Sequence, residues 1–111
     1  MIRSTVWRDK QGCIRRFSVK GHADSAEYGQ DIVCAAVSML VTNAINSCEK
    51  FLGVCLVADE QVKPGDVDCT VPVSSGADDD KLQLLLEAMA FGIQQVAEAY
   101  PDFVKVFERN Q

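Results

Sequence analysis

"DIVCAAVSMLVTNAINSCEKFLG", residues 31–53, is the longest helical pattern in the chain, and the other predicted elements are arranged around it. Apolar residues recur at steps of three and four, which predicts a helix from about Asp31 to Leu52 that ends at Gly53. Residues 32–41 are apolar on nearly every side, so we expect this half of the helix to be covered on two sides. The expected inward positions are Val33, Ala36, Val37, Leu40, Ala44, Cys48 and Phe51.

Before this helix, residues 2–9 and 13–20 are β-rich runs joined by a short polar connection that ends in Gly12. This pattern is typical of a β-hairpin, with Phe17 and Val19 facing the core.

A second pair of β-rich runs, 54–62 and 67–73, flanks the turn sequence "KPGD" at 63–66. It predicts a second hairpin. One face of its second strand is expected to carry Val67, Cys69, Val71 and Val73.

Residues 78–80 are three aspartates that precede a second helical pattern. Carboxylates in this place are typical of an N-cap and an acidic first turn, and no metal site is assigned to them.

Residues 103–110 predict a short final strand. The order β-β-α-β-β-α with this extra strand predicts an α+β fold in one domain, residues 1–111, with a mostly antiparallel sheet from two hairpins packed with two helices. In the second helix, the residues expected to form one apolar face are Leu82, Leu85, Leu86, Met89, Ile93, Val96 and Tyr100.

Composition restricts the partners of the chain. Of its 111 residues 48% are hydrophobic and 24% charged, as in a folded globular protein, and the formal net charge is −5. This charge repels phosphate backbones, and no run of Lys and Arg with interleaved aromatics offsets it. We therefore expect no direct binding of nucleic acid.

The first residues lack the apolar run of a signal peptide, and no segment is expected to be long enough to span a membrane, which predicts a cytoplasmic protein. The five cysteines are scattered without a C-x-x-C pair, so neither a disulfide framework nor a zinc site is indicated. A free cysteine is most often a small buried hydrophobe, and a catalytic role needs a special setting.

Cys34 has such a setting. With Asp31 as N-cap, Cys34 falls in the first turn of the long helix, where the positive end of the helix dipole lowers a thiol pKa. The only histidine, His22, lies twelve residues earlier in a glycine-flanked segment, 21–29, that we expect to be mobile enough to bring the imidazole to the sulfur. The alternative is an exposed imidazole and a packed thiol that never meet.

Two neighbours of Cys34 have more than one interpretation. Asp31 acts as a simple N-cap or orients the imidazole of His22, and its charge opposes a thiolate. Ser38 lies one turn beyond Cys34 and either lines a pocket or hydrogen-bonds back to the helix.

Gly21-His22-Ala23, Gly29 and residues 31–38, "DIVCAAVS", resemble the signature of the bacterial ribosomal-processing cysteine protease family, Prp. The resemblance implies a cytosolic, homodimeric endopeptidase without cofactor or metal. Its substrate is then the N-terminal extension of a large-subunit ribosomal protein of the bacterial L27 type, cut after an aromatic residue that a groove beside the helix start accepts.

The resemblance also assigns roles to residues. It implies that Cys34 is the nucleophile and His22 its general base and acid, with Asp31 as a possible orienting residue. Gly21 and Ser38 match motif positions and are candidates for substrate binding.

Two other functions stay open. A ribosome-associated binding module of the same fold would bind the extension without cutting it. A redox sensor would oxidise Cys34 reversibly. For an activated nucleophile, we expect alkylation to label Cys34 before the other four thiols.

Overall fold

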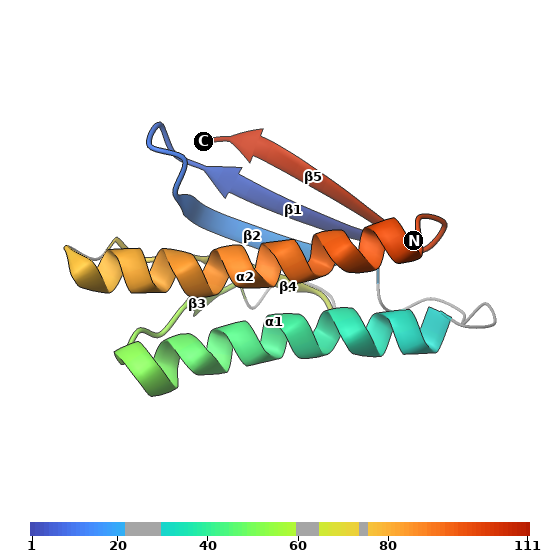
Figure 1. Ribbon diagram of the computed structural model, residues 1–111, viewed down its shortest axis with the longest axis horizontal. Coiled ribbons are helices and arrows are strands. Elements are labelled where there is room, and N and C mark those ends of the chain that lie inside the picture. Colours follow the sequence, from blue (N-terminus) through green and yellow to red (C-terminus); the bar gives the residue numbers. More distant parts are fainter. Residues whose placement is uncertain (22–29, 60–64, 74–75) are drawn as a thin grey trace.

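The computed structural model describes residues 1–21, 30–59, 65–73 and 76–111, which form one sheet and two long helices (Figure 1). The segments 22–29, 60–64 and 74–75 lie outside the described residues. In chain order the elements are β1 (Ile2–Arg8), β2 (Ile14–Lys20), α1 (Gln30–Leu52), β3 (Val57–Ala58), β4 (Val67–Thr70), α2 (Ala77–Ala99) and β5 (Val104–Asn110).

The five strands lie in the order β3-β4-β2-β1-β5. Three neighbouring pairs are antiparallel, and β5 lies parallel to β1, with Val104 opposite Ile2. The predicted α+β class with a mostly antiparallel sheet is confirmed, and so is the additional C-terminal strand. The last strand is parallel because α2 carries the chain back along the sheet before β5 begins.

Both helices lie on the same side of the sheet (Figure 1). Alternate residues of the strands point to this side, and Phe17 and Val19 of β2 are buried there as expected. The α1 residues in the same core are Val33, Val37, Val41, Ala44 and Cys48.

The ends of α1 agree with the sequence prediction to within one residue. Gly53 has a φ of +66°, and its N–H donates to the carbonyl of Glu49 at 2.9 Å, which closes the last turn. Two expected core positions, Ala36 and Phe51, are instead exposed, and Val41 is buried in their place. The reason is that only the side of α1 that meets the sheet and α2 is buried, although apolar residues lie all round the helix.

The two-sided cover expected for the first half of α1 is not found among the described residues of one chain. Ile32 is 71% exposed and Met39 is 58% exposed. On its covered side, α1 approaches α2 closely, because a Cβ at Gly92 would come within 2.7 Å of the Leu40 side chain.

The expectation that no segment has the length of a membrane span is wrong. Residues 31–52 of α1 contain an 18-residue window with a mean hydropathy of 1.4, and by length and composition they could cross a bilayer. Within the fold, however, Val33, Val37 and Val41 are buried against other elements, as in a core helix.

The second hairpin is shorter than predicted. β3 has two residues and β4 ends at Thr70. Cys69 and Val71 are buried as expected, but Val73 is 80% exposed. Pro72 explains this end of the strand because it lacks a backbone N–H for the ladder. Part of the predicted turn, residues 63–64, falls outside the described residues.

The N-cap of α2 is Gly76, not an aspartate, and Asp78, Asp79 and Asp80 lie in the first turn. Asp79 forms an ion pair with Arg15 at 3.2 Å, so it joins the helix to β2. Tyr100 follows the helix and is half exposed, which removes it from the predicted stripe.

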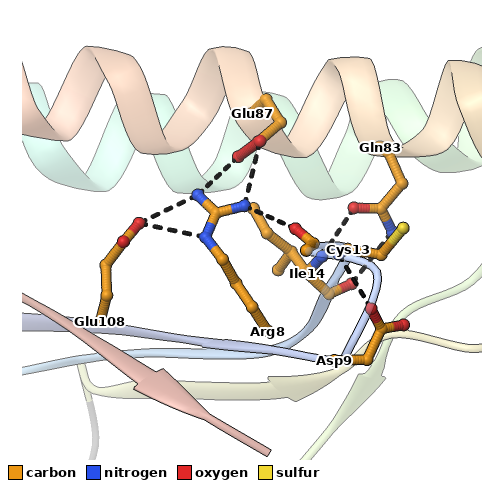
Figure 2. Close-up of polar contacts among 8 residues, drawn as sticks. Arg8, Asp9, Cys13, Ile14, Gln83, Glu87 and Glu108 are labelled. Carbon is orange, nitrogen blue, oxygen red and sulfur yellow. Dashed lines mark hydrogen bonds and ion pairs between the residues drawn. The ribbon is translucent and has the colours of Figure 1, made fainter.

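Polar contacts fix α2 over the first hairpin (Figure 2). Arg8 forms ion pairs with Glu87 of α2 at 2.8 Å and with Glu108 of β5 at 3.0 Å. The side chain of Gln83 accepts a hydrogen bond from the Ile14 N–H and donates one to the Ile14 carbonyl. These contacts join the first hairpin, β1 and β2, to α2 and to β5.

Candidate active site

Cys34 is the fifth residue of α1 and lies between the buried residues Val33 and Val37. Its side chain is half-buried and packs against the core. Because the helix begins at Gln30, Asp31 is part of the first turn, and the expectation that Asp31 is the N-cap is wrong. Cys34 therefore lies one turn inside the helix.

The electrostatic surroundings of Cys34 differ from the expectation. Burial raises the pKa of the Cys34 thiol above its usual value, the Asp31 carboxylate raises it further, and the N-terminal amine of Met1 lowers it. The predicted lowering of the pKa by the helix start is thus not found in these surroundings, because loss of hydration and a neighbouring negative charge both penalise the thiolate.

Gly21 shares this end of the molecule. Its φ is +99°, and a Cβ added there would overlap the carbonyl oxygen of Met1. Its N–H donates a hydrogen bond to Oδ1 of Asp66 at 3.0 Å. Gly21 therefore joins the end of β2, the start of β1 and the residues before β4, and only glycine fits.

His22 lies outside the described residues, so its pairing with Cys34 stays a prediction. Ser38 is exposed on the same flank of α1 as Cys34, one turn further on. Its hydroxyl forms no hydrogen bond with the residues that the structure describes, including those of its own helix. Of the two interpretations, this geometry favours a surface side chain available to a ligand.

An open apolar groove of about 580 Å³ lies between α1 and α2. Its α1 side is formed by Ala36, Leu40 and their neighbours, which are on the opposite flank of the helix from Cys34. The expected groove beside the helix start is therefore not this one. Sequence periodicity did not reveal the groove, because its two walls come from separate helices. Its lining is Ala36, Met39, Leu40, Asn43, Gly92, Gln95, Val96, Ala99 and Tyr100.

The other cysteines have different surroundings. Cys55 is exposed, Cys13 is half-buried, and Cys48 and Cys69 are buried with pKa values that burial raises. Because Cys55 is exposed, and because burial raises the pKa of the Cys34 thiol, we expect alkylation to label Cys55 before Cys34, which reverses the order expected from sequence.

We expect Asp31→Asn to lower the pKa of Cys34, because it removes a carboxylate that raises that pKa. The thiolate fraction of Cys34 then rises at every pH below the wild-type pKa. Alkylation of Cys34 at pH 7 therefore becomes faster. The rate is measured by mass spectrometry in a Cys55→Ser background. Asp78→Asn, at the start of α2, is the matched control. Equal alkylation rates in the two variants would mean that the Asp31 carboxylate does not raise the pKa of the Cys34 thiol.

A family model described as "Cysteine protease Prp" matches residues 1–105. A relative from Bacillus subtilis (strain 168), the ribosomal processing cysteine protease Prp, is 33% identical over 107 residues, which span 96% of this chain and 96% of the relative. A Staphylococcus aureus protein of the same name is 26% identical and spans 96% of this chain and 97% of its own length.

Solved structures share the whole fold. A crystal structure from Streptococcus mutans is 37% identical, has a TM-score of 0.86 and matches 100% of this chain and 96% of its own. The S. aureus protease Prp with a substrate peptide also has a TM-score of 0.86, and at 23% identity it shows the fold alone, over 98% of this chain and 100% of that one. The same protease with a covalently linked product peptide has a TM-score of 0.82 at 25% identity, over the same shares of both chains.

Proposed function

Because the chain belongs to the Prp family of cysteine proteases, we propose that it is a cytoplasmic endopeptidase for ribosomal protein maturation. Its substrate is the N-terminal extension of a large-subunit ribosomal protein of the bacterial L27 type. The observation that carries the proposal is Cys34, a half-buried thiol near the start of α1 in a chain that matches cysteine proteases over nearly its full length.

The proposed reaction is acyl transfer through Cys34. His22 takes the proton from Sγ as the sulfur attacks the scissile carbonyl, and then gives that proton to the leaving amine. Water hydrolyses the thioester and restores the thiol. The pKa of the Cys34 thiol is raised by burial and by Asp31, so this scheme includes a base at the moment of attack.

The first turn of α1 is suited to the transition state. Backbone N–H groups of residues 30–32, in the first turn, have no i−4 acceptor in the helix and lie close to Cys34 in the chain. Such groups stabilise the oxyanion that forms when a carbonyl is attacked.

Three further residues support this site. Asp31 opposes a thiolate, so its favourable role is to orient His22 and to stabilise the imidazolium that proton transfer creates. Ser38 is exposed beside the sulfur and contacts the bound peptide. Gly21 holds the chain in place immediately before His22.

The same proposal includes a homodimer formed through the helices. The outer surface of the two helices exposes Ile32 and Met39 of α1 and Leu84 and Phe91 of α2. The apolar groove runs between them on the flank away from Cys34, so a second copy can cover it without closing the sulfur. Exposed apolar patches of this kind mark association surfaces.

Met39→Glu is expected to dissociate the dimer. A buried charge without a partner costs an interface about 2 kcal/mol or more, which corresponds to roughly a thirtyfold weaker association. Molar mass is measured by light scattering on a sizing column over a dilution series. Val73→Glu, at an exposed valine away from the helices, is the control and keeps the wild-type mass. A monomeric wild-type protein, or an unchanged Met39→Glu dimer, contradicts this interface.

Incubation with the host's own ribosomal protein precursor tests the proposed activity. Mass spectrometry is expected to find a new N-terminus after an aromatic residue, and His22→Ala is expected to abolish it. The binding-module alternative predicts a complex with the precursor and no new N-terminus.

A further inference from the structure

The sheet face that points away from both helices gathers cations that are scattered in the sequence. Strand register places Lys105 of β5, Arg3 of β1 and Lys20 of β2 directly beside one another, and all three are exposed. Four residues further along β1, Trp7 lies between Arg109 and Arg16 in the same way. We call this surface the basic sheet face; it consists of Arg3, Trp7, Arg16, Lys20, Lys105, Phe107 and Arg109.

The charge of this face is opposite to that of the whole chain, which is −5. Arg3, Lys20 and Lys105 form no ion pair with any residue in the described ranges. Like charges on directly opposed strand residues destabilise a sheet, so this row favours an anionic partner. Lys20 also acts on the Asp68 carboxylate, whose pKa it lowers together with Arg16.

The carboxylates on the neighbouring part of the sheet already have partners. Asp68 forms an ion pair with Arg16 at 2.7 Å, and Asp66 accepts the hydrogen bond from the Gly21 N–H. Asp59 lies beside Arg16 and Asp68 in a hollow at the β3–β4 edge. The cations of β1 and β5 lie at the other side of the face, where their charge is not neutralised.

Aromatic side chains on this face favour RNA over an acidic protein as the anionic partner. The guanidinium of Arg16 lies 4.0 Å above the Trp7 ring, and that of Arg109 lies 5.8 Å from the Phe107 ring. Aromatic rings and guanidinium planes on an open sheet stack the bases of single-stranded RNA, whereas an acidic protein surface needs only the cations.

We propose that the basic sheet face binds single-stranded RNA, with phosphates at Arg3, Lys20 and Lys105 and bases at Trp7 and Phe107. This surface is separate from Cys34, which lies in the helical layer on the other side of the sheet. The net charge of the whole chain predicted no binding of nucleic acid. Strand pairing, however, places several positively charged side chains on one face of the sheet, and the net charge does not reveal this.

Trp7 is the only tryptophan, so its fluorescence reports directly on this face. A single-stranded twelve-nucleotide RNA is titrated into the Cys34→Ala protein at low salt, which keeps the result independent of cleavage. We expect quenching that saturates. The combined variant Arg3→Glu, Lys20→Glu, Lys105→Glu is expected to bind at least about tenfold more weakly. Its slope of log K against log salt falls by about 2, at about 0.7 for each phosphate contact.

The control variant makes the same change of charge elsewhere, at the exposed residues Lys10, Lys50 and Lys81, and is expected to bind like the parent. Phe107→Ala is expected to weaken binding without changing the salt slope, which separates stacking from charge. Circular dichroism confirms that each variant is folded. Absence of quenching, equal losses in the two charge variants, or equally tight binding of polyglutamate would each overturn the proposal. The last result assigns the face to an acidic protein instead.

Discussion

Cys34→Ala is expected to abolish cleavage of the extended ribosomal protein and to leave the fold intact. Without the sulfur no thioester forms, and loss of the nucleophile in comparable proteases lowers turnover by at least about 10³-fold. The fold is retained because Cys34 is only half-buried and alanine keeps the helix. The measurement is the rate of appearance of the new N-terminus, with thermal unfolding followed in parallel.

Cys55→Ser is the matched control, because it removes an exposed thiol outside the helix. Its cleavage rate is expected to equal that of the wild type. Cys34→Ser keeps the shape of the side chain and is expected to be as inactive as the alanine variant, since a hydroxyl is a much weaker nucleophile here. Normal cleavage by either Cys34 variant refutes the proposed nucleophile.

Gly21→Ala is expected to cause the largest loss of stability among single substitutions near the site. Its φ of +99° is unfavourable for any other residue, at a cost of about 1–3 kcal/mol, and the added Cβ also overlaps the Met1 carbonyl. Relief of that overlap moves β1 away from β2 or breaks the hydrogen bond to Asp66. We expect a total loss of more than about 3 kcal/mol, with reduced cleavage because His22 follows directly.

Gly12→Ala isolates the two contributions. Gly12 also has a positive φ, +84°, but nothing lies within 4 Å of an added Cβ. Its variant therefore carries backbone strain without overlap and is expected to lose only about 1–3 kcal/mol. Urea unfolding of both variants gives the difference. Equal losses contradict a special requirement for glycine beside Met1.

Local patterns were sufficient for much of the fold. Alternation and the Gly12 turn predicted the first hairpin, and the three- and four-residue steps predicted α1 to within one residue of its observed start. Local patterns failed for β4, where Pro72 ended the ladder before Val73. They also failed for Ala36 and Phe51, because a helix with apolar residues on nearly every side gives no signal of which side meets the sheet.

The candidate site was found in the sequence through Cys34 and its position near a helix start. The direction of its pKa shift was wrong, because it depends on burial and on the Asp31 carboxylate as well as on the helix. The apolar groove between α1 and α2 required both helices in place.

The sequence by itself determined the order of the elements and the place of Cys34 near the start of a long helix, since these depend on residue types and short spacings. Tertiary structure alone decided that Gly21 must avoid Met1, that β5 lies parallel to β1, and that Arg3, Lys20 and Lys105 share one row. The physical reason is that contacts between distant strands depend on register, and register is set by packing of the whole core rather than by any local segment.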